Sequence, residues 1–172
     1  MCIRDSYADA AAWLDEFPNL IVTRTFSKIY GLAGLRVGYA VSSAQIADWF
    51  NRARQPFNVS AVAQAAALAA LRAPEYVERS RAFNRAGLEQ LRQGCDALEL
   101  AYLPSAANFL CVAMPSGASR APAIYEYLLE RGVVVRPVEN YGLPNHLRVT
   151  AGHEQENAAF LTALRAALDS HA

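Results

Sequence analysis

The chain has 172 residues, of which 53% are hydrophobic, so it can bury the core of one compact domain or of one and a half smaller ones. Sixteen basic residues balance sixteen acidic ones and the charges are interspersed, which argues against nucleic acid and membrane surfaces as partners. The three cysteines have no CxxC spacing and no nearby histidine pair, so we expect neither a disulfide framework nor a metal site. Because no segment resembles a signal peptide or a bilayer span, we expect a cytoplasmic protein.

The first half of the chain is predicted to form two strands followed by three helices. The stretch NLIVTRTF is apolar and rich in β-branched residues, which is typical of a buried strand. Gly31 and Gly34 give the backbone freedom for a compact connection to the second strand. A serine precedes each of the first two helices, and Pro74 starts the third. The predicted strands are 19–26 and 35–42, and the predicted helices are 43–55, 60–72 and 74–98.

The second half of the chain is predicted to be an α/β unit of its own. Three strand-like runs are separated by one helix and followed by another. The strands are 108–114, 132–138 and 146–151, and the helices are 119–132 and 154–168. We place a domain boundary along the long helix, which gives a strand-plus-helix piece of residues 7–79, part of a large domain, and a small α/β domain of residues 80–172.

Lys28 follows directly after the first predicted strand. An amine at the C-terminal edge of a strand can point into the crevice where α/β sheets bind ligands, and can attack a carbonyl there. Thr25, Ser27 and Arg36 lie on the same short segment, so their hydroxyls and guanidinium can hold an anion beside the amine. This combination suits a phosphorylated aldehyde such as pyridoxal phosphate. The alternative is a solvated surface lysine, and the nearby glycines match no nucleotide-binding fingerprint.

The stretch TFSKIYGLAGLRVGY resembles the cofactor-lysine motif of fold-type I pyridoxal-phosphate aminotransferases, and most closely that of the histidinol-phosphate aminotransferase family. The similarity continues through PSAANFLCV and LLERGVVVRPVENYGLPNHLRVTAG and covers roughly residues 7–170. It implies that Lys28 binds pyridoxal 5′-phosphate as the internal aldimine. It also implies that Thr25, Ser27 and Arg36 bind the cofactor phosphate.

Two arginines of the second half are implied to bind the substrate. By resemblance, Arg148 of HLRVT binds its anionic group and Arg136 of VVVRPV helps to receive its phosphate. Both are flanked by β-branched residues that favour burial, and a buried unpaired guanidinium is costly without an anion; the alternative is that both face solvent. Asn108 either contacts the ligand or makes a strand-end backbone hydrogen bond. His146 and His153 have no partner at ligand spacing and are expected at the surface.

For the whole protein, the resemblance implies amino transfer from glutamate to imidazole-acetol phosphate, and from histidinol phosphate to 2-oxoglutarate, in histidine biosynthesis. It also implies a homodimer. Because fold and cofactor residues do not fix the substrate, a threonine-phosphate decarboxylase or another aminotransferase remains an alternative. An inactive, truncated remnant is the third possibility.

The resemblance covers only the C-terminal half of such an enzyme. The family's aspartate partner of the pyridine nitrogen, its ring-contacting tyrosine and its glycine-rich phosphate turn would all lie upstream of Met1. Residues 1–6, MCIRDS, do not match the acidic strand expected there and are interpreted as a non-native leader. We therefore expect the chain alone to be inactive, and its first 70 residues to expose apolar surface and an unpaired strand edge.

Overall fold

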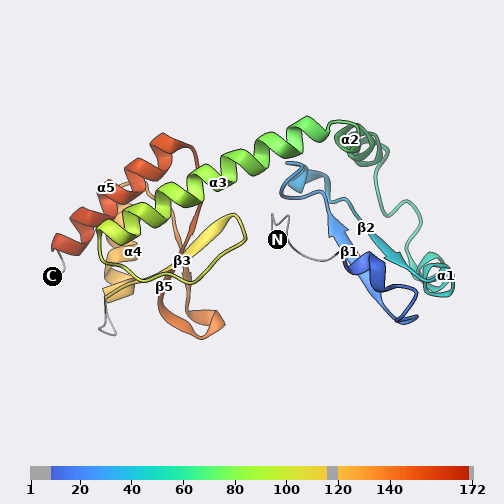
Figure 1. Ribbon diagram of the computed structural model, residues 1–172, viewed down its shortest axis with the longest axis horizontal. Helices are drawn as coiled ribbons and strands as arrows, with labels where there is room; N and C mark the ends of the chain where they lie inside the picture. The colour runs from blue at the N-terminus through green and yellow to red at the C-terminus, as the bar shows by residue number, and fades with distance from the viewer. Residues whose placement is uncertain (1–8, 116–119, 171–172) are drawn as a thin grey trace. The chain divides into compact units, whose positions relative to one another are not determined.

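The computed structural model describes residues 9–115 and 120–170 (Figure 1). They form two compact units, a first unit that ends at Ser80 and a second unit that begins at Arg81, within the long helix α3 (Pro74–Ala97). Each unit is described by itself. The proposed leader, residues 1–6, lies outside the described residues, and the two predicted domains stay a prediction. No helix in the described ranges is long and apolar enough to cross a membrane.

The first unit is built on a two-stranded antiparallel sheet. Ile21 pairs with Ser42 at one end of the hairpin and Thr25 pairs with Gly38 at the other. A Cβ at Gly38 would lie 2.6 Å from the carbonyl oxygen of Arg24, so the hairpin needs a glycine there. The elements are η1 (Ala10–Trp13), β1 (Ile21–Thr25), η2 (Ala33–Leu35), β2 (Gly38–Ser42), α1 (Ala44–Ala53) and α2 (Ala61–Leu71).

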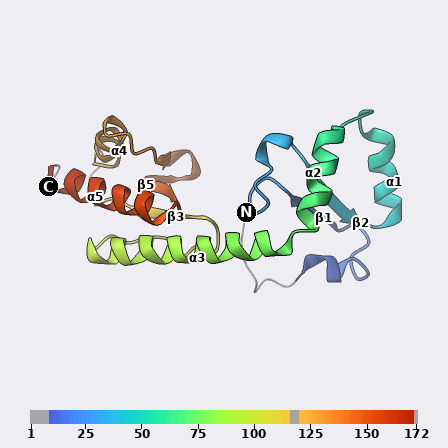
Figure 2. The ribbon, with the colours of Figure 1, turned by 90° about the horizontal axis from the view of Figure 1, so that it is seen from above.

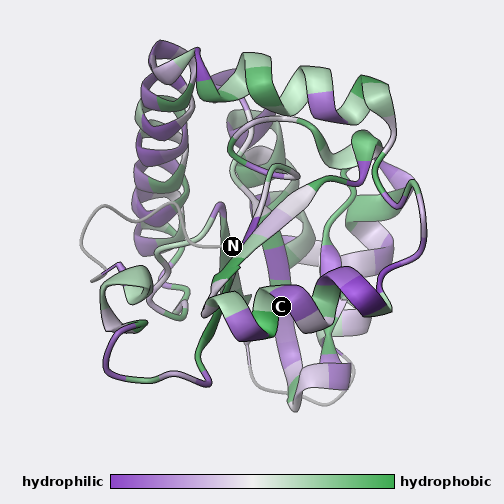
Figure 3. Ribbon diagram, turned by 90° about the vertical axis from the view of Figure 1, so that its right-hand side faces the viewer, coloured by the Kyte–Doolittle hydropathy of each residue, from purple (hydrophilic) through white to green (hydrophobic). Residues whose placement is uncertain are grey.

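The core of the first unit is small. It consists of Phe26, Val37, Ala63 and Ala67, with partly buried neighbours around them. The prediction that the first strand is buried is wrong, because Val22 is the one buried residue of β1 and, of the described strands, β2 alone pairs with it. The expectation of exposed apolar surface is confirmed, and Figure 3 shows how much of the secondary structure is hydrophobic. The exposed large apolar residues among the first 70 are Trp13, Phe17, Ile21, Tyr39, Val41, Trp49, Phe50, Phe57, Val62 and Leu68.

The second unit packs helices against one face of a three-stranded antiparallel sheet, with β5 between β3 and β4 (Figures 1 and 2). Leu110 and Val112 of β3 and Leu147 and Val149 of β5 are buried in the core together with residues of α3, α4 and α5. The three segments predicted as strands therefore all form strands. The elements are β3 (Phe109–Ala113), α4 (Arg120–Glu130), β4 (Arg136–Val138), η3 (Glu139–Tyr141), β5 (Leu143–Thr150) and α5 (Glu154–Ser170).

The strand β4 is shorter than the predicted strand 132–138. Gly132 has a φ of +74°, and the N–H of Val133 donates to the carbonyl oxygen of Leu128 at 2.9 Å. These features end α4 in the way that glycine commonly ends a helix, and they use the N–H of Val133 before a sheet can. Val134 is 77% exposed, so pairing begins only at Arg136.

A buried polar network fixes the turn after β5 against α3. Asn157 is 2% exposed, and its Oδ1 accepts from the N–H of Gly152 at 2.9 Å. Its Nδ2 donates to Gln90 of α3 at 2.9 Å and to the carbonyl oxygen of Gly152 at 3.1 Å. A Cβ at Gly87 would lie 3.1 Å from that same carbonyl oxygen, so the helix approaches the turn closely. Because its polar groups are satisfied, this network holds the C-terminal end of β5 in place.

Candidate functional site

Lys28 lies on an exposed turn just after β1. The buried ring of Phe26 anchors the start of this turn, and the carbonyl oxygen of Phe26 accepts from the N–H of Leu32 at 3.0 Å. The carbonyl oxygen of Lys28 accepts from the N–H of Gly31 at 2.8 Å, and Gly31 has a φ of +69°, which favours glycine. The turn is thus closed by backbone hydrogen bonds at a fixed place beside β1.

Three of the predicted cofactor-binding residues meet at the hydroxyl of Ser27. The Thr25 hydroxyl donates to the Ser27 hydroxyl at 2.9 Å, and the Ser27 N–H donates to the Thr25 hydroxyl at 3.1 Å. Arg36 donates from Nη1 to the Ser27 hydroxyl at 3.4 Å and to the carbonyl oxygen of Ala33 at 2.9 Å. The cluster of Thr25, Ser27 and Arg36, next to Lys28 in the chain, is called the serine cluster below.

The backbone of Arg36 is left-handed, with φ 52° and ψ 52°. This conformation is uncommon for a residue other than glycine and costs of order 1–3 kcal/mol. It follows η2, and the Arg36 side chain turns back to Ser27 across the glycine-bearing connection. Strained backbone of this kind is concentrated at ligand sites, which favours a binding role for the serine cluster.

Lys28 has a further property that the local motif does not reveal, because it is the single lysine of the 172-residue sequence. The other fifteen of the sixteen basic residues are arginines. Generic surface lysines are therefore absent from this sequence, and the alternative role of Lys28 as one of them loses its main support. A count over the whole sequence was the signal that motif analysis missed.

In the second unit, the two predicted substrate-binding arginines are directly opposite each other. Arg136 of β4 pairs with Arg148 of β5. Like charges in this position destabilise a sheet, so a bound anion would relieve the repulsion. Arg148 is half-buried, and its guanidinium lies 5.1 Å from the centre of the Phe109 ring. Its Nε is buried and has no hydrogen-bond partner in the part of the chain that the structure describes. Arg136 is exposed, 5.9 Å from the centre of the Tyr141 ring.

Asn108 lies just before β3, where its carbonyl oxygen accepts from the N–H of Ala151 at 2.9 Å. This backbone bond ties the ends of β3 and β5 together, while a contact of Asn108 with a ligand stays a prediction. Cys111 is paired with Arg148 across the sheet. Burial raises the pKa of the Cys111 thiol, and the nearby Arg148 charge acts in the opposite direction. Burial, with a smaller effect of Asp96, raises the pKa of Cys95 to about 11, so this thiol is uncharged at neutral pH and is no candidate nucleophile.

The comparison with known families covers nearly the whole chain. Residues 1–164 match the family described as "Aminotransferase class I and II". The chain belongs to this family.

The relatives of this class I and II aminotransferase chain agree on the fold. This chain is 51% identical over 163 residues to histidinol-phosphate aminotransferase 1 of Nitrosococcus oceani, and the match covers 95% of this chain and 43% of the relative. The crystal structure of histidinol-phosphate aminotransferase from Sinorhizobium meliloti in complex with pyridoxal-5′-phosphate is 34% identical, with a TM-score of 0.83, covering 90% of this chain and 42% of that one. The chain thus spans less than half the length of these relatives, and the predicted α/β fold class is confirmed.

A third relative has a similar fold but is named for a different reaction. The L-threonine-O-3-phosphate decarboxylase from Porphyromonas gingivalis is 24% identical, with a TM-score of 0.83, and the match covers 97% of this chain and 52% of that chain. At this identity the likeness shows the fold alone. The substrate of such a protein therefore depends on the side chains of its site and not on its fold.

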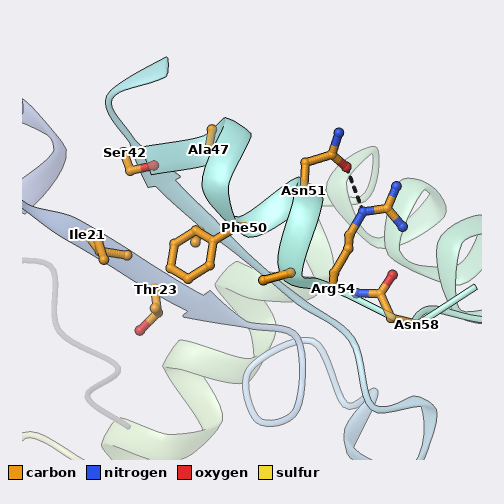
Figure 4. A pocket seen from close by; sticks show the side chains of 10 residues that line it. Ile21, Thr23, Ser42, Ala47, Phe50, Asn51, Arg54 and Asn58 are labelled. Carbon is orange, nitrogen blue, oxygen red and sulfur yellow. Dashed lines mark hydrogen bonds between the residues drawn. The ribbon is translucent and has the colours of Figure 1, made fainter. Parts of the chain in front are cut away.

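The first unit of this aminotransferase chain also has a hollow of about 640 Å³ between β1, β2 and α1 (Figure 4). Apolar side chains, including Ile21 and Phe50, line much of it, and Arg54 and Asn51 form a hydrogen bond of 2.7 Å at one side. Neither Lys28 nor the serine cluster is among its lining residues. The hollow is accordingly distinct from the predicted cofactor site.

The structure corrects the prediction for His146, which was expected at the surface. His146 is half-buried, and its Nδ1 is buried without a hydrogen-bond partner. The signal in the sequence was its position two residues before Arg148, because side chains at that spacing share one face of a strand. His153 is exposed as expected, with its ring 4.7 Å from that of Phe83.

Proposed function

We propose that the whole protein is a pyridoxal-phosphate-dependent aminotransferase that exchanges amino groups between histidinol phosphate and 2-oxoglutarate. The observation that carries this proposal is the serine cluster beside the single lysine of the sequence. The 51% identity to a histidinol-phosphate aminotransferase supports the choice of substrate.

The residues of the first unit suit a phosphorylated aldehyde. Two hydroxyls and one guanidinium converge at Ser27, and Arg36 forms no ion pair within the described ranges, so its charge is free for a phosphate. We assign Thr25, Ser27 and Arg36 to the cofactor phosphate and Lys28 to its carbonyl carbon. When bound, the cofactor supplies an electrophilic carbon and a ring that accepts electrons from the substrate.

Lys28 has two roles in this proposal. Its Nζ is the nucleophile that would hold the carbonyl carbon of the cofactor. Nζ would also be the base that takes the proton from the substrate carbon and returns it. The closed turn from Lys28 to Gly31 fixes the backbone from which this side chain extends.

Arg148 and Arg136 receive the anionic end of the substrate. A guanidinium offers a planar fork of donors that fits a carboxylate or a phosphate. The same pair can then accept the phosphate of histidinol phosphate in one half-reaction and a carboxylate of glutamate in the other. The buried, unpartnered Nε of Arg148 supports this role, and Asn108 is assigned a contact with the same ligand.

For the whole protein we also propose a homodimer in the cytoplasm that acts on small molecules and binds neither nucleic acid nor membrane. The resemblance of the motifs supports the dimer. The equal numbers of acidic and basic residues support the absence of a polyanionic partner.

The decisive experiment tests histidinol phosphate, threonine phosphate and other amino acids as substrates of the whole protein loaded with pyridoxal phosphate. We expect turnover of histidinol phosphate with 2-oxoglutarate and none of threonine phosphate. Release of carbon dioxide from threonine phosphate would instead establish the decarboxylase, and turnover of other amino acids alone would establish a different aminotransferase.

A second measurement uses the 172-residue chain and tests whether it is an inactive remnant. After incubation with pyridoxal phosphate and reduction by borohydride, mass spectrometry should find the label on Lys28, the only lysine available. Lys28→Arg is the matched control that keeps the charge and should remain unlabelled. Labelling of the wild-type chain at the terminal amine alone would mean that this chain does not form the cofactor site.

A further inference from the structure

The sheet of the second unit has a second face, on the side away from the core helices described above. Side chains alternate between the two faces of a strand. Leu147 and Val149 of β5 lie in the core, so His146, Arg148 and Thr150 point away from it. Each of these residues is half-buried or exposed. This outer face consists of Phe109, Cys111 and Ala113 of β3, His146, Arg148 and Thr150 of β5, and Arg136 of β4.

The outer face is cationic and has no carboxylate. In the described part of the chain, neither Arg136 nor Arg148 forms an ion pair. The residue opposite His146 on β3 is Ala113, and the residue opposite Arg148 is Cys111. These two side chains are smaller than His146 and Arg148, which they face.

Two buried atoms on this face, Nδ1 of His146 and Nε of Arg148, have no hydrogen-bond partner among the described residues. A neutral imidazole has one N–H and one acceptor nitrogen, and a buried N–H without an acceptor is costly. Nδ1 has no acceptor among residues 9–115 and 120–170, so Nε2 is the ring nitrogen whose N–H can reach a ligand. His146 is half-buried rather than buried, so the ring can offer this Nε2–H to a ligand beside the arginines.

We propose that His146 is a third donor of the substrate-anion site and that it makes this site prefer a phosphate monoester to a carboxylate. The proposal rests on the function proposed above. A carboxylate is planar, and one guanidinium fork satisfies both of its oxygens. A phosphate has three terminal oxygens and a charge of about −1.5 to −2 at pH 7, so it accepts from a further donor outside that plane. His146 stands about 7 Å along the strand from Arg148, within reach of an anion held between the two side chains.

The test is a set of three variants of the whole protein, His146→Ala, His146→Gln and His146→Asn. We expect His146→Ala to raise the KM for histidinol phosphate roughly tenfold or more, while the KM for glutamate and both kcat values stay within twofold. His146→Gln places an amide N–H near the position of Nε2 and should restore much of the affinity. His146→Asn, whose shorter amide reaches only the position of Nδ1, should not. His153→Ala is the matched control, because His153 follows the same strand and is exposed.

Inorganic phosphate provides a readout that does not depend on the proposed substrate. Its dissociation constant, measured by equilibrium dialysis, should rise in His146→Ala in step with the KM for histidinol phosphate, and rise less in His146→Gln. An unchanged phosphate affinity in His146→Ala, or an equal loss of phosphate and glutamate affinity, would overturn the inference. Failure of the wild-type protein to turn over histidinol phosphate, with normal phosphate binding that depends on His146, would instead refute only the proposed function.

Discussion

The two units have cores of very different size. In the second unit, three helices cover a three-stranded sheet and large side chains such as Leu91, Leu110 and Ile124 are fully buried. In the first unit the core is formed by Phe26, Val37 and two alanines, and β1 is largely exposed. Burial of apolar surface is the main term that offsets conformational entropy. The arginine-bearing sheet is therefore held by its own core, whereas the lysine-bearing hairpin has few buried contacts of its own.

The two units also divide the proposed chemistry. The first unit carries the amine and the serine cluster, and the second carries the arginine pair. Changes in the first unit should therefore abolish the reaction or release the cofactor, and changes in the second should weaken substrate binding alone.

Lys28→Ala in the whole protein should reduce amino transfer at least about a thousandfold, because the nucleophile and the base are lost together. Lys28→Arg should have the same effect although it keeps the charge, since a guanidinium is a poor nucleophile at neutral pH. Single-turnover assays with histidinol phosphate measure the loss. Turnover by Lys28→Ala at the wild-type rate would remove the first unit from the chemistry altogether.

Leu110→Ala should destabilise the second unit by about 2–5 kcal/mol, because Leu110 is fully buried in its core. Amide hydrogen exchange of β3 and β5 follows this unit. Both tryptophans, Trp13 and Trp49, lie in the first unit, so fluorescence follows that unit separately. Val134→Ala, at a 77% exposed position, is the control and should change stability by less than about 0.5 kcal/mol. A fluorescence transition that shifts together with the exchange rates in Leu110→Ala would show that the two units unfold as one.

Arg36→Ala and Arg148→Ala should separate cofactor binding from substrate binding. Each removes charged hydrogen bonds worth about 1.5–3 kcal/mol, or roughly ten- to a hundredfold in a binding constant. Arg36→Ala should weaken retention of pyridoxal phosphate, measured by dialysis and absorbance. Arg148→Ala should raise the KM for histidinol phosphate and leave the cofactor bound. The opposite pattern would mean that the two arginines have each other's roles.

Much of this division could be predicted from the sequence where the cause is local. Ser60 precedes α2 and accepts from the N–H of Ala63 at 3.2 Å, and Pro74 starts α3 where a first-turn proline is expected. The serine cluster spans only twelve residues, from Thr25 to Arg36, so a motif contains all of its members.

The remaining features depend on distant parts of the chain, and the sequence predicted them poorly. The exposure of β1 depends on which strands lie beside it, and its apolar pattern is that of a strand with neighbours on both faces. The facing of Arg136 and Arg148 depends on a strand register that shifts between Pro137 and Val138. The orphaned Nδ1 of His146 depends on what covers the ring, which a single strand pattern does not contain.

The exposed apolar residues of the first unit should make the 172-residue chain self-associate. Phe57 is 96% exposed, and burying one such side chain contributes about 1.5–3 kcal/mol. Phe57→Ser should therefore weaken association roughly ten- to a hundredfold, measured by light scattering over a concentration series. The neighbouring exposed Asn58→Ser is the control and should leave association unchanged. A monomeric wild-type chain that melts cooperatively would contradict the claim that the first unit needs further contacts.

The two glycines that follow Lys28, Gly31 and Gly34, look alike in the sequence and differ in the structure. Gly31 has a φ of +69°, and a Cβ there would lie 2.9 Å from the hydroxyl oxygen of Tyr76. Gly34 has no atom within 4 Å of such a Cβ and is not among the residues with positive φ. Gly31→Ala should therefore cost about 1–2 kcal/mol, whereas Gly34→Ala should be neutral or stabilise by about 0.4–1 kcal/mol. Because the N–H of Gly31 closes the turn on the carbonyl oxygen of Lys28, Gly31→Ala should also slow borohydride labelling of Lys28, and Gly34→Ala should not. Tryptophan fluorescence in urea measures the first effect, and mass spectrometry over a time course measures the second. If both variants label as fast as the wild type while only Gly31→Ala loses stability, the turn supports the fold of the first unit without positioning the amine.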